Sequence, residues 1–310
     1  SKFQEALEAA KNLIKTFPKD SILQNISGAC YAGLGELGSA VKSYEKAISI
    51  NPDYAKAHYN LGGAYHELQQ YEDSISSYEK SLEINPDYAE AHNNLGNVLR
   101  DLDMLDEAIN CYKKAIIFNP EYIEALYSLG NSLYENAQFE NAREAYQKAL
   151  EIKPDYPTLH NNLGNVHKDL GQLDDAIKSY KNALIHNPQY VESHNNLGIA
   201  LLEIGNHAGA IESLKKAILI DSNYIDAHYN LAITLKEVNK TDHAIKSYKK
   251  TISLNPNFAE AHNNLGNLQK NLNQFDDALK SFERAIEIKP NFAEAHNNLG
   301  NVFKDLNQLD

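Results

Sequence analysis

The sequence predicts an all-α fold: an α-solenoid built from 34-residue helix-turn-helix units. Three observations predict it: a helix-breaking proline at constant spacing, apolar residues at helical spacing, and small residues at fixed positions. Eight of the nine prolines lie on the 34-residue spacing: Pro18, Pro52, Pro86, Pro120, Pro154, Pro188, Pro256 and Pro290. Because proline ends helices, this spacing indicates one structural unit copied along the chain.

Residues 89–122 show how one unit is built. Ala91, Leu95 and Leu99 recur at four-residue steps, which predicts an amphipathic first helix. Residues 106–118 show the same kind of period and predict a second helix. The turn between the helices holds Gly or Asn in most units: Gly35, Gly171, Gly205, Asn239, Asn273 and Asn307. Both residue types tolerate the left-handed conformation that ends a helix.

Small and large residues also recur with the repeat. One column is glycine: Gly28, Gly62, Gly96, Gly130, Gly164, Gly198, Gly266 and Gly300. A second column, in the second helix, is aromatic: Tyr44, Tyr78, Tyr112, Tyr146, Tyr180, Tyr248 and Phe282. We expect the glycines to let two helix backbones approach closely and the aromatic rings to fill the opposing gap.

The 34-residue period, these columns and the final proline resemble the tetratricopeptide repeat (TPR) family over the whole chain. The resemblance implies a right-handed superhelix of helix pairs. It divides the single array over 1–310 into the second helix of a truncated repeat (1–20), eight full repeats (21–292) and the first helix of another truncated repeat (293–310). We expect the array to be a piece of a longer one. One departure from the family is a histidine column: His58, His92, His160, His194, His228, His262 and His296.

The net charge bears on the class of partner, and the cysteine content bears on the cellular compartment. The net charge is −13, with 42 acidic and 29 basic residues, which argues against a nucleic-acid backbone or an anionic membrane as the partner. The two cysteines, Cys30 and Cys111, lie far apart and form no C-x-x-C motif. This usage favours a reducing compartment, and we expect a cytoplasmic location. No apolar run approaches the ~18 residues of a membrane span.

No motif for catalysis or for a metal is present. The histidines lie on different helices, which pack ~8–10 Å apart, whereas zinc needs nitrogen ligands at ~2.0–2.1 Å. We therefore expect each imidazole to pack at a repeat junction and to form a local hydrogen bond. The H-E-x-x-H, P-loop and G-x-S-x-G motifs are also missing from the sequence. The sequence predicts no enzyme activity, no cofactor and no metal for this fragment.

Two columns of asparagine mark the first helices. The first column, which we call the asparagine ladder, consists of Asn60, Asn94, Asn162, Asn196, Asn230, Asn264 and Asn298. The second column, three residues further on, consists of Asn97, Asn131, Asn165, Asn267 and Asn301. Residues three apart share one helix face. Asparagine lowers helix stability in mid-helix, so a compensating role is expected.

The interpretation we favour is binding of an extended polypeptide. In a TPR superhelix the first helices line the concave groove, so the resemblance places both columns there. A carboxamide offers a donor and an acceptor to a peptide backbone. With helices ~10 Å apart and ~3.3 Å per extended residue, one asparagine would meet roughly every third residue. The arrangement resembles the TPR region of O-linked N-acetylglucosamine transferase, which implies a ladder for substrate polypeptides.

Two simpler explanations for the columns stay open: recent duplication of the repeats, and hydrogen bonds between neighbouring repeats. A basic row borders the columns (Arg100, Lys168, Lys236, Lys270 and Lys304), and acidic residues follow it at Glu67, Asp101, Glu135, Asp169, Glu203, Glu237 and Asp305. The groove is therefore expected to be mixed in charge.

Three hypotheses for function follow. The leading one is a non-catalytic protein-protein interaction scaffold that binds extended polypeptide in a concave, asparagine-lined groove. The second is a substrate-recruiting arm of a larger enzyme, such as an O-GlcNAc-transferase-like glycosyltransferase. The third is a structural repeat that self-associates end to end through uncapped terminal repeats.

Overall fold

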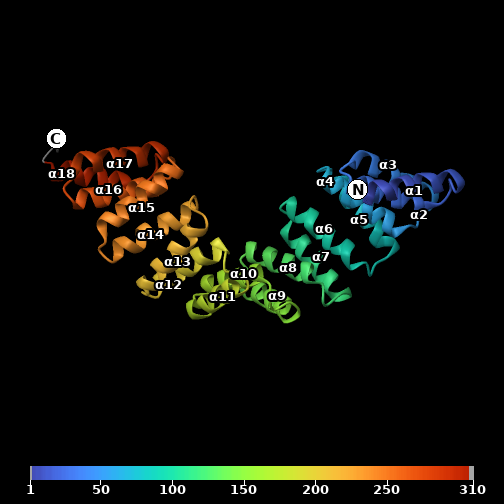
Figure 1. Cartoon of the computed structure of the whole chain (residues 1–310), viewed down its shortest axis with the longest axis horizontal. Helices are drawn as coiled ribbons and strands as arrows, with labels where there is room; N and C mark the ends of the chain where they lie inside the picture. Colours follow the sequence, from blue (N-terminus) through green and yellow to red (C-terminus); the bar gives the residue numbers. More distant parts are fainter. Residues whose placement is uncertain (1, 307–310) are drawn as a thin grey trace. The chain divides into compact units, whose positions relative to one another are not determined.

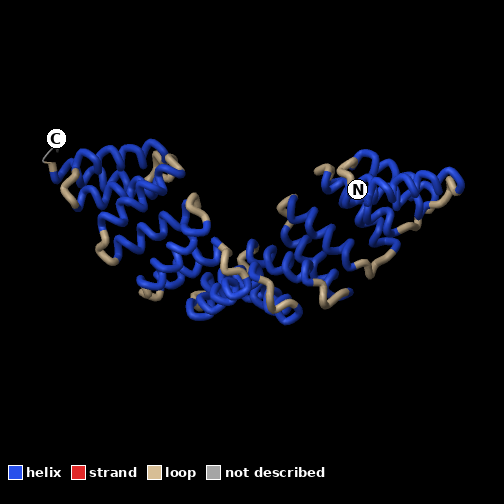
Figure 2. Tube along the Cα trace, in the orientation of Figure 1, coloured by secondary structure: helices blue, strands red, loops and turns tan. Residues whose placement is uncertain are grey.

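A computed structural model describes residues 2–306, and its regular structure in that range is entirely helical (Figures 1 and 2). The first helices of the repeats are α2 (Ser21–Gly33), α4 (Ala55–Glu67), α6 (Ala89–Asp101), α8 (Ile123–Glu135), α10 (Pro157–Asp169), α12 (Val191–Glu203), α14 (Ile225–Glu237), α16 (Ala259–Asn271) and α18 (Ala293–Asp305). The second helices are α1 (Lys2–Thr16), α3 (Leu37–Ile50), α5 (Tyr71–Ile84), α7 (Leu105–Phe118), α9 (Phe139–Ile152), α11 (Leu173–His186), α13 (His207–Ile220), α15 (Thr241–Leu254) and α17 (Phe275–Ile288). The predicted all-α solenoid of helical pairs is confirmed.

The helices group into two compact units, residues 1–154 and 155–310. Within each unit every helix packs against the next one in the chain (Figure 1). Successive first helices also contact each other: α2, α4, α6 and α8 in the first unit, and α10, α12 and α14, then α16 and α18, in the second. Successive second helices in the described chain make no comparable contacts. In each unit the first helices therefore line the tighter, inner face of the stack.

Close packing within a repeat depends on the glycine column. A Cβ placed on Gly164 would lie 2.5 Å from the Tyr180 ring, and one on Gly96 would lie 2.7 Å from the Tyr112 ring. Both tyrosines are fully buried. The predicted roles of the glycine and aromatic columns are thus confirmed: the missing side chain makes room for the ring.

The turns between the two helices follow the expected left-handed pattern. The residue at this position has a positive φ in each of the following turns: Gly35, Gln69, Asp103, Ala137, Gly171, Gly205, Asn239 and Asn273. Asn307, expected in the same role, lies outside the described residues. The turn is therefore built even where the sequence supplies Gln69 or Ala137, whose side chains disfavour this conformation.

Side chains of the histidine column form hydrogen bonds to the backbone of the loop that precedes the first helix. Nε2 of His92 donates to the carbonyl oxygen of Pro86 at 2.9 Å, six residues earlier. The same bond is made by His58, His194, His262 and His296 to prolines and by His228 to Ser222. Each of these histidines bonds a carbonyl six residues earlier, at the end of the preceding repeat, so the expectation of local hydrogen bonding at a repeat junction is confirmed for these copies.

Burial shifts the titration of three of these histidines. It lowers the pKa of His92, His194 and His262, and a cation on the following second helix lowers each pKa further, while the bond to the proline carbonyl opposes the shift. The Nδ1 atoms of His92 and His194 are buried without a partner. A second proton on these rings would therefore be poorly solvated.

The glycine column yields a stability prediction. Gly164→Ala forces a methyl group against Tyr180, so we expect it to destabilise the protein by about 1–3 kcal/mol. Gly300→Ala is the matched control, because a Cβ added there would contact no atom of the described chain beyond the nearby backbone of its own helix. It should gain about 0.5–1 kcal/mol of helix propensity. Urea denaturation measures both, and equal effects would contradict the packing role.

The histidines yield a pH prediction. As the pH falls through the unfolded-state pKa of ~6.5, the unfolded chain takes up protons that folded His92, His194 and His262 resist. The free energy of unfolding should therefore be highest above about pH 7. It should decline as the pH falls from about 7 to the lower pKa of the folded-state histidines. Urea midpoints at pH 7.5 and 5.5 measure the loss.

A variant in which these three histidines are replaced by glutamine keeps a donor for the proline carbonyl and does not titrate. We expect it to lose less stability than the unchanged protein over this range. His243→Gln, at an exposed position of α15, is the control. An identical loss in the triple variant would exclude these histidines as its source.

Candidate functional site

The asparagine ladder lies on the first helices, on the inner face of each unit. All seven members are half-buried, near the middle of α4, α6, α10, α12, α14, α16 and α18. Three residues on, the second asparagine column is half-buried on α6, α10, α16 and α18, and on α8, where Ser128 takes the ladder position. On α6, α10, α16 and α18, which carry an asparagine of each column, the two side chains share one helix face and are close enough to act together on one ligand.

Ladder amides link each repeat to the one before it. In six members the Nδ2 group donates to a side chain one residue before the ladder position of the preceding repeat. The bonds are Asn60 to Asn25 (2.9 Å), Asn94 to Tyr59 (2.9 Å), Asn196 to Asn161 (3.2 Å), Asn230 to Asn195 (2.9 Å), Asn264 to Tyr229 (3.1 Å) and Asn298 to Asn263 (3.0 Å). The bonds that the repeat-to-repeat interpretation expects are therefore present.

The accepting asparagines belong to the packed interior. Asn161 and Asn195 are 5 % exposed and Asn263 is 1 % exposed. Buried polar groups need partners, and each ladder amide supplies one. The sequence shows that the position before the ladder is either asparagine or tyrosine, but it does not show that this side chain accepts a hydrogen bond from the next repeat. That pairing depends on how the repeats stack.

The oxygen of the ladder carboxamide remains available in several repeats. In residues 2–306, Oδ1 of Asn60, Asn230, Asn264 and Asn298 accepts no hydrogen bond from the protein. The inter-repeat bond holds the nitrogen, so it also fixes the direction of this oxygen. A ligand N–H group is the kind of partner that such an oxygen accepts.

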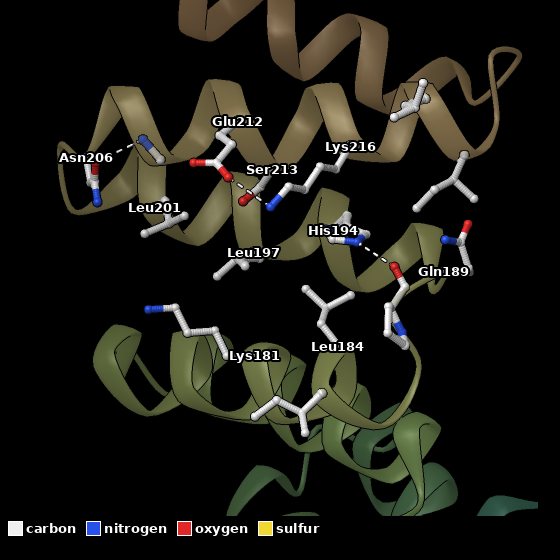
Figure 3. A pocket seen from close by; sticks show the side chains of 15 residues that line it. Lys181, Leu184, Gln189, His194, Leu197, Leu201, Asn206, Glu212, Ser213 and Lys216 are labelled. Carbon is white, nitrogen blue, oxygen red and sulfur yellow. Dashed lines mark hydrogen bonds and ion pairs between the residues drawn. The ribbon is translucent and has the colours of Figure 1, made fainter.

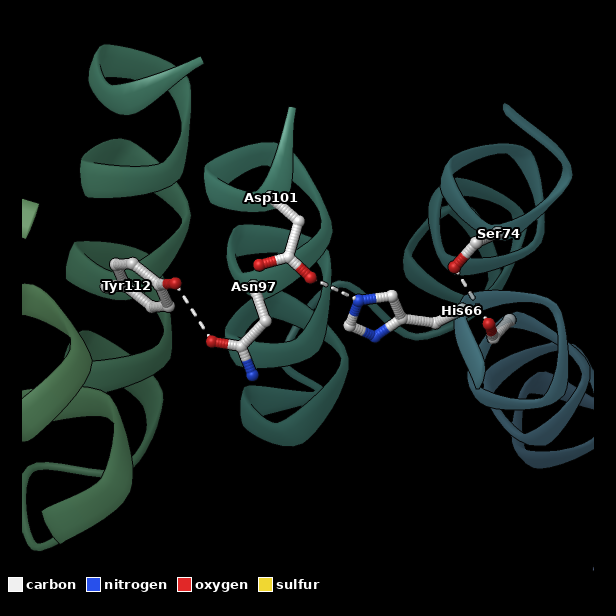
Figure 4. Close-up of polar contacts among 6 residues, drawn as sticks. His66, Ser74, Asn97, Asp101 and Tyr112 are labelled. Carbon is white, nitrogen blue, oxygen red and sulfur yellow. Dashed lines mark hydrogen bonds and ion pairs between the residues drawn. The ribbon is translucent and has the colours of Figure 1, made fainter. Parts of the chain in front are cut away.

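In the second asparagine column the carboxamide oxygen is bonded within the protein, whereas in the ladder the nitrogen is. The hydroxyl of Tyr112 donates to Oδ1 of Asn97 at 2.9 Å (Figure 4). Tyr146 donates to Asn131 at 2.7 Å and Tyr180 to Asn165 at 2.8 Å. These bonds occupy the oxygens, and the amide nitrogens of Asn97 and Asn165 donate to no group in the described chain.

Two members of the second column differ. The position that would supply a hydroxyl to Asn267 is Phe282, and neither Asn267 nor Asn301 makes a side-chain hydrogen bond within the described residues. Their carboxamides have both ends available. Replacing either one removes no side-chain hydrogen bond of the described chain.

Aromatic rings border the asparagines at the N-terminal ends of the first helices. The Tyr59 ring lies 4.9 Å from that of Tyr88, and the Tyr229 ring lies 4.7 Å from that of Phe258. Burial raises the pKa of Tyr88 to about 12, with Tyr59 and Glu90 adding to the shift. The sequence contained the signal for this column, since Tyr54, Tyr88, Tyr122, Tyr156, Tyr190, Tyr224, Phe258 and Phe292 recur every 34 residues.

Ion pairs cross between first helices at their C-terminal ends. His66 Nε2 donates to Asp101 Oδ2 at 2.8 Å (Figure 4), and Lys270 Nζ lies 3.4 Å from Asp305 Oδ2. Part of the acidic row is therefore bonded to side chains of the preceding repeat, Asp101 by a hydrogen bond from His66 and Asp305 by an ion pair with Lys270. This agrees with the expectation of a face of mixed charge.

Neither a metal centre nor a membrane span is found in the part of the chain that the structure describes. No group of three or more His, Cys, Asp or Glu side chains there could hold a metal ion. Among residues 2–306, no helix combines the length and apolar character needed to cross a membrane.

Comparison with known families identifies the class. The model of the TPR repeat matches residues 28–69, 63–103, 96–137, 130–171, 164–205, 200–239 and 235–273, and that of the tetratricopeptide repeat matches residues 259–292. The chain therefore belongs to the tetratricopeptide repeat family. A comparison with curated proteins gives no match.

Solved structures share the fold. A crystal structure of MamA is 31% identical, with a TM-score of 0.50, over 54% of this chain and 97% of that one. YrrB, described as a TPR protein with an unusual peptide-binding site, is 24% identical, with a TM-score of 0.52, over 60% of this chain and 96% of that one. A chain of the Cut9–Hcn1 hetero-tetramer of APC/C is 17% identical, with a TM-score of 0.60, over 96% of this chain and 58% of that one.

The inter-repeat bond yields a prediction. Asn230→Ala removes the amide that donates to buried Asn195, so we expect a loss of about 1–3 kcal/mol in unfolding free energy. Asn267→Ala is the matched control: it replaces a half-buried asparagine in mid-helix that makes no side-chain bond, and its effect should stay within about 0.5 kcal/mol. Chemical denaturation compares the two. Equal values would show that the inter-repeat bond adds nothing to stability.

Proposed function

We propose that this chain is a protein-interaction scaffold that holds an extended polypeptide segment against the two asparagine columns of its first helices. One observation carries the proposal: four ladder asparagines, Asn60, Asn230, Asn264 and Asn298, keep a carbonyl oxygen available while their nitrogens are bonded to the preceding repeat. The likeness to YrrB supports only the fold, so the proposal rests on the geometry of this chain.

The two columns suit a peptide backbone because they offer both polarities. Ladder oxygens accept from peptide N–H groups, and second-column nitrogens donate to peptide carbonyl groups. An extended peptide presents both groups at every residue, whatever its side chains are. The scaffold would therefore recognise the conformation of the ligand more than its sequence.

Affinity would come from the number of contacts. Each hydrogen bond contributes about 0.5–1.5 kcal/mol net, which is about 2- to 13-fold in the dissociation constant. The inter-repeat and tyrosine bonds order most carboxamides before a ligand arrives. Less side-chain entropy is then lost on binding.

We extend the proposal to the class of partner, the absence of catalysis and the cellular compartment. The net charge of −13 favours a polypeptide partner over nucleic acid or an anionic membrane. We propose that the chain binds without catalysing a reaction and that it works in a reducing compartment such as the cytoplasm.

Peptide binding can be tested with a phage-displayed library of random peptides. The best enriched peptide is made with a fluorescent label, and its dissociation constant is measured by anisotropy. Asn264→Ala combined with Asn267→Ala removes one acceptor and one donor, so we expect at least about fivefold weaker binding. Asn110→Ala, at an exposed position of the second helix α7, should leave the affinity unchanged.

The ligand supplies a further control for this experiment. The same peptide with alternate backbone nitrogens methylated lacks half of its N–H donors and should bind at least tenfold more weakly. Circular dichroism verifies that each variant is folded. Unchanged affinity in the double variant would refute the proposed site.

A further inference from the structure

A groove opens on the outer face of the second unit, away from the asparagine columns. It lies between the second helices α11 and α13, with the first helix α12 as its floor (Figure 3). Leu197 and Leu201 of α12 form the floor, and Leu184 lines the α11 wall (Figure 3). The volume of the groove is about 780 Å³.

Exposed aliphatic side chains line both walls of this groove. Ile185 of α11 is 71 % exposed and Leu219 of α13 is 84 % exposed. Their column in the repeat carries serine or glutamate in other copies, namely Ser49, Glu83, Glu151, Ser253 and Glu287. The fold therefore does not require an apolar residue there. Two exposed aliphatic side chains on one groove indicate a surface that a partner covers.

The first unit contains a groove of the same kind, of about 400 Å³, between α7 and α9 over α8. Its lining residues Lys113, Ile117 and Lys148 lie two repeats before Lys181, Ile185 and Lys216. Ile117 is also 71 % exposed. The same combination of lysines and exposed isoleucine thus occurs in both units.

The rim of the second-unit groove is basic, although the chain as a whole is acidic. Lys181 stands on the α11 wall and forms no ion pair in the described chain, and Lys216 stands on the α13 wall (Figure 3). Glu212, the acidic residue that lines this groove, lies 2.8 Å from Lys216, which neutralises it. Carboxylates on a ligand would therefore meet an uncompensated positive charge.

The backbone around the groove favours a helical ligand. Walls and floor are helices whose main-chain groups are already paired, so the groove offers no strand edge. An extended peptide would leave its own N–H and C=O groups unpaired on an apolar floor, whereas a helix satisfies them internally. Amphipathic helices bind apolar grooves in this way.

We propose that the groove between α11 and α13 binds an amphipathic helix of another protein. Its aliphatic face packs on Leu197 and Leu201 and against Ile185 and Leu219. Its acidic residues face Lys181, whose charge no carboxylate of the described chain compensates. This surface is separate from the asparagine columns, so the proposal does not depend on peptide binding at the inner face.

The probe is a side-chain-stapled synthetic helix of about 18 residues. It has leucines at i, i+3, i+4 and i+7 and glutamates on both flanks of that stripe. A second peptide carries lysines in place of the glutamates. Every protein variant, and the reference protein, also carries Ile117→Glu, which removes the groove of the first unit from the measurement.

Ile185→Glu combined with Leu219→Glu is the test variant, and Ser253→Glu is the control at the same repeat position outside the groove. We expect the acidic helix to bind the reference and the control equally, and to bind the test variant at least tenfold more weakly. Lys181→Gln should weaken the acidic helix and not the lysine-flanked one. Thermal unfolding should be the same in all variants, because the substituted side chains are exposed.

Several results would overturn the proposal. These are failure of the acidic helix to bind the reference, equal binding of the acidic and lysine-flanked helices, and full affinity in the test variant. Analytical ultracentrifugation of the unliganded full chain tests whether a second copy of the chain occupies the groove instead. A concentration-dependent dimer that the test variant abolishes would assign the groove to a second copy of this chain.

Discussion

The rest of the structure depends on the close approach of the two helices of each repeat at the glycine column. The Tyr112 ring occupies the space where a Gly96 side chain would be, and its hydroxyl then reaches Asn97, the next residue. The same arrangement links Gly164, Tyr180 and Asn165. One contact therefore fixes the helical pair and also orients an asparagine on the inner face.

Asparagine suits this inner face because its side chain has two different ends. At Asn230 the nitrogen bonds the preceding repeat and the oxygen stays available, whereas at Asn97 a tyrosine occupies the oxygen. Stacking of repeats and contact with a ligand therefore need not compete for the same atom. The polar inner face and the apolar outer groove lie on opposite sides of the second unit, so one chain has room for two kinds of partner.

Much of the fold could be predicted from the sequence, because a proline, a glycine and an aromatic residue each act locally and recur every 34 residues. The local hydrogen bonding of the histidines was predicted as well, although its acceptor, the proline carbonyl, was not. The partners of Asn230 and Asn264 lie one repeat away, so they depend on stacking geometry that periodicity does not encode. The tyrosine–asparagine bond also crosses between helices, although both columns were visible. The sequence does not distinguish Ile185 and Leu219 as a binding surface, because single exposed aliphatic residues are common.

The most direct measurement is a crystal structure of this chain with a peptide enriched from the random library. We expect an extended peptide along the first helices, with its N–H groups about 2.7–3.2 Å from ladder Oδ1 atoms. The ladder Nδ2 atoms should remain bonded to the preceding repeat. A peptide bound elsewhere, or ladder amides rotated so that their nitrogens face the ligand, would contradict the account.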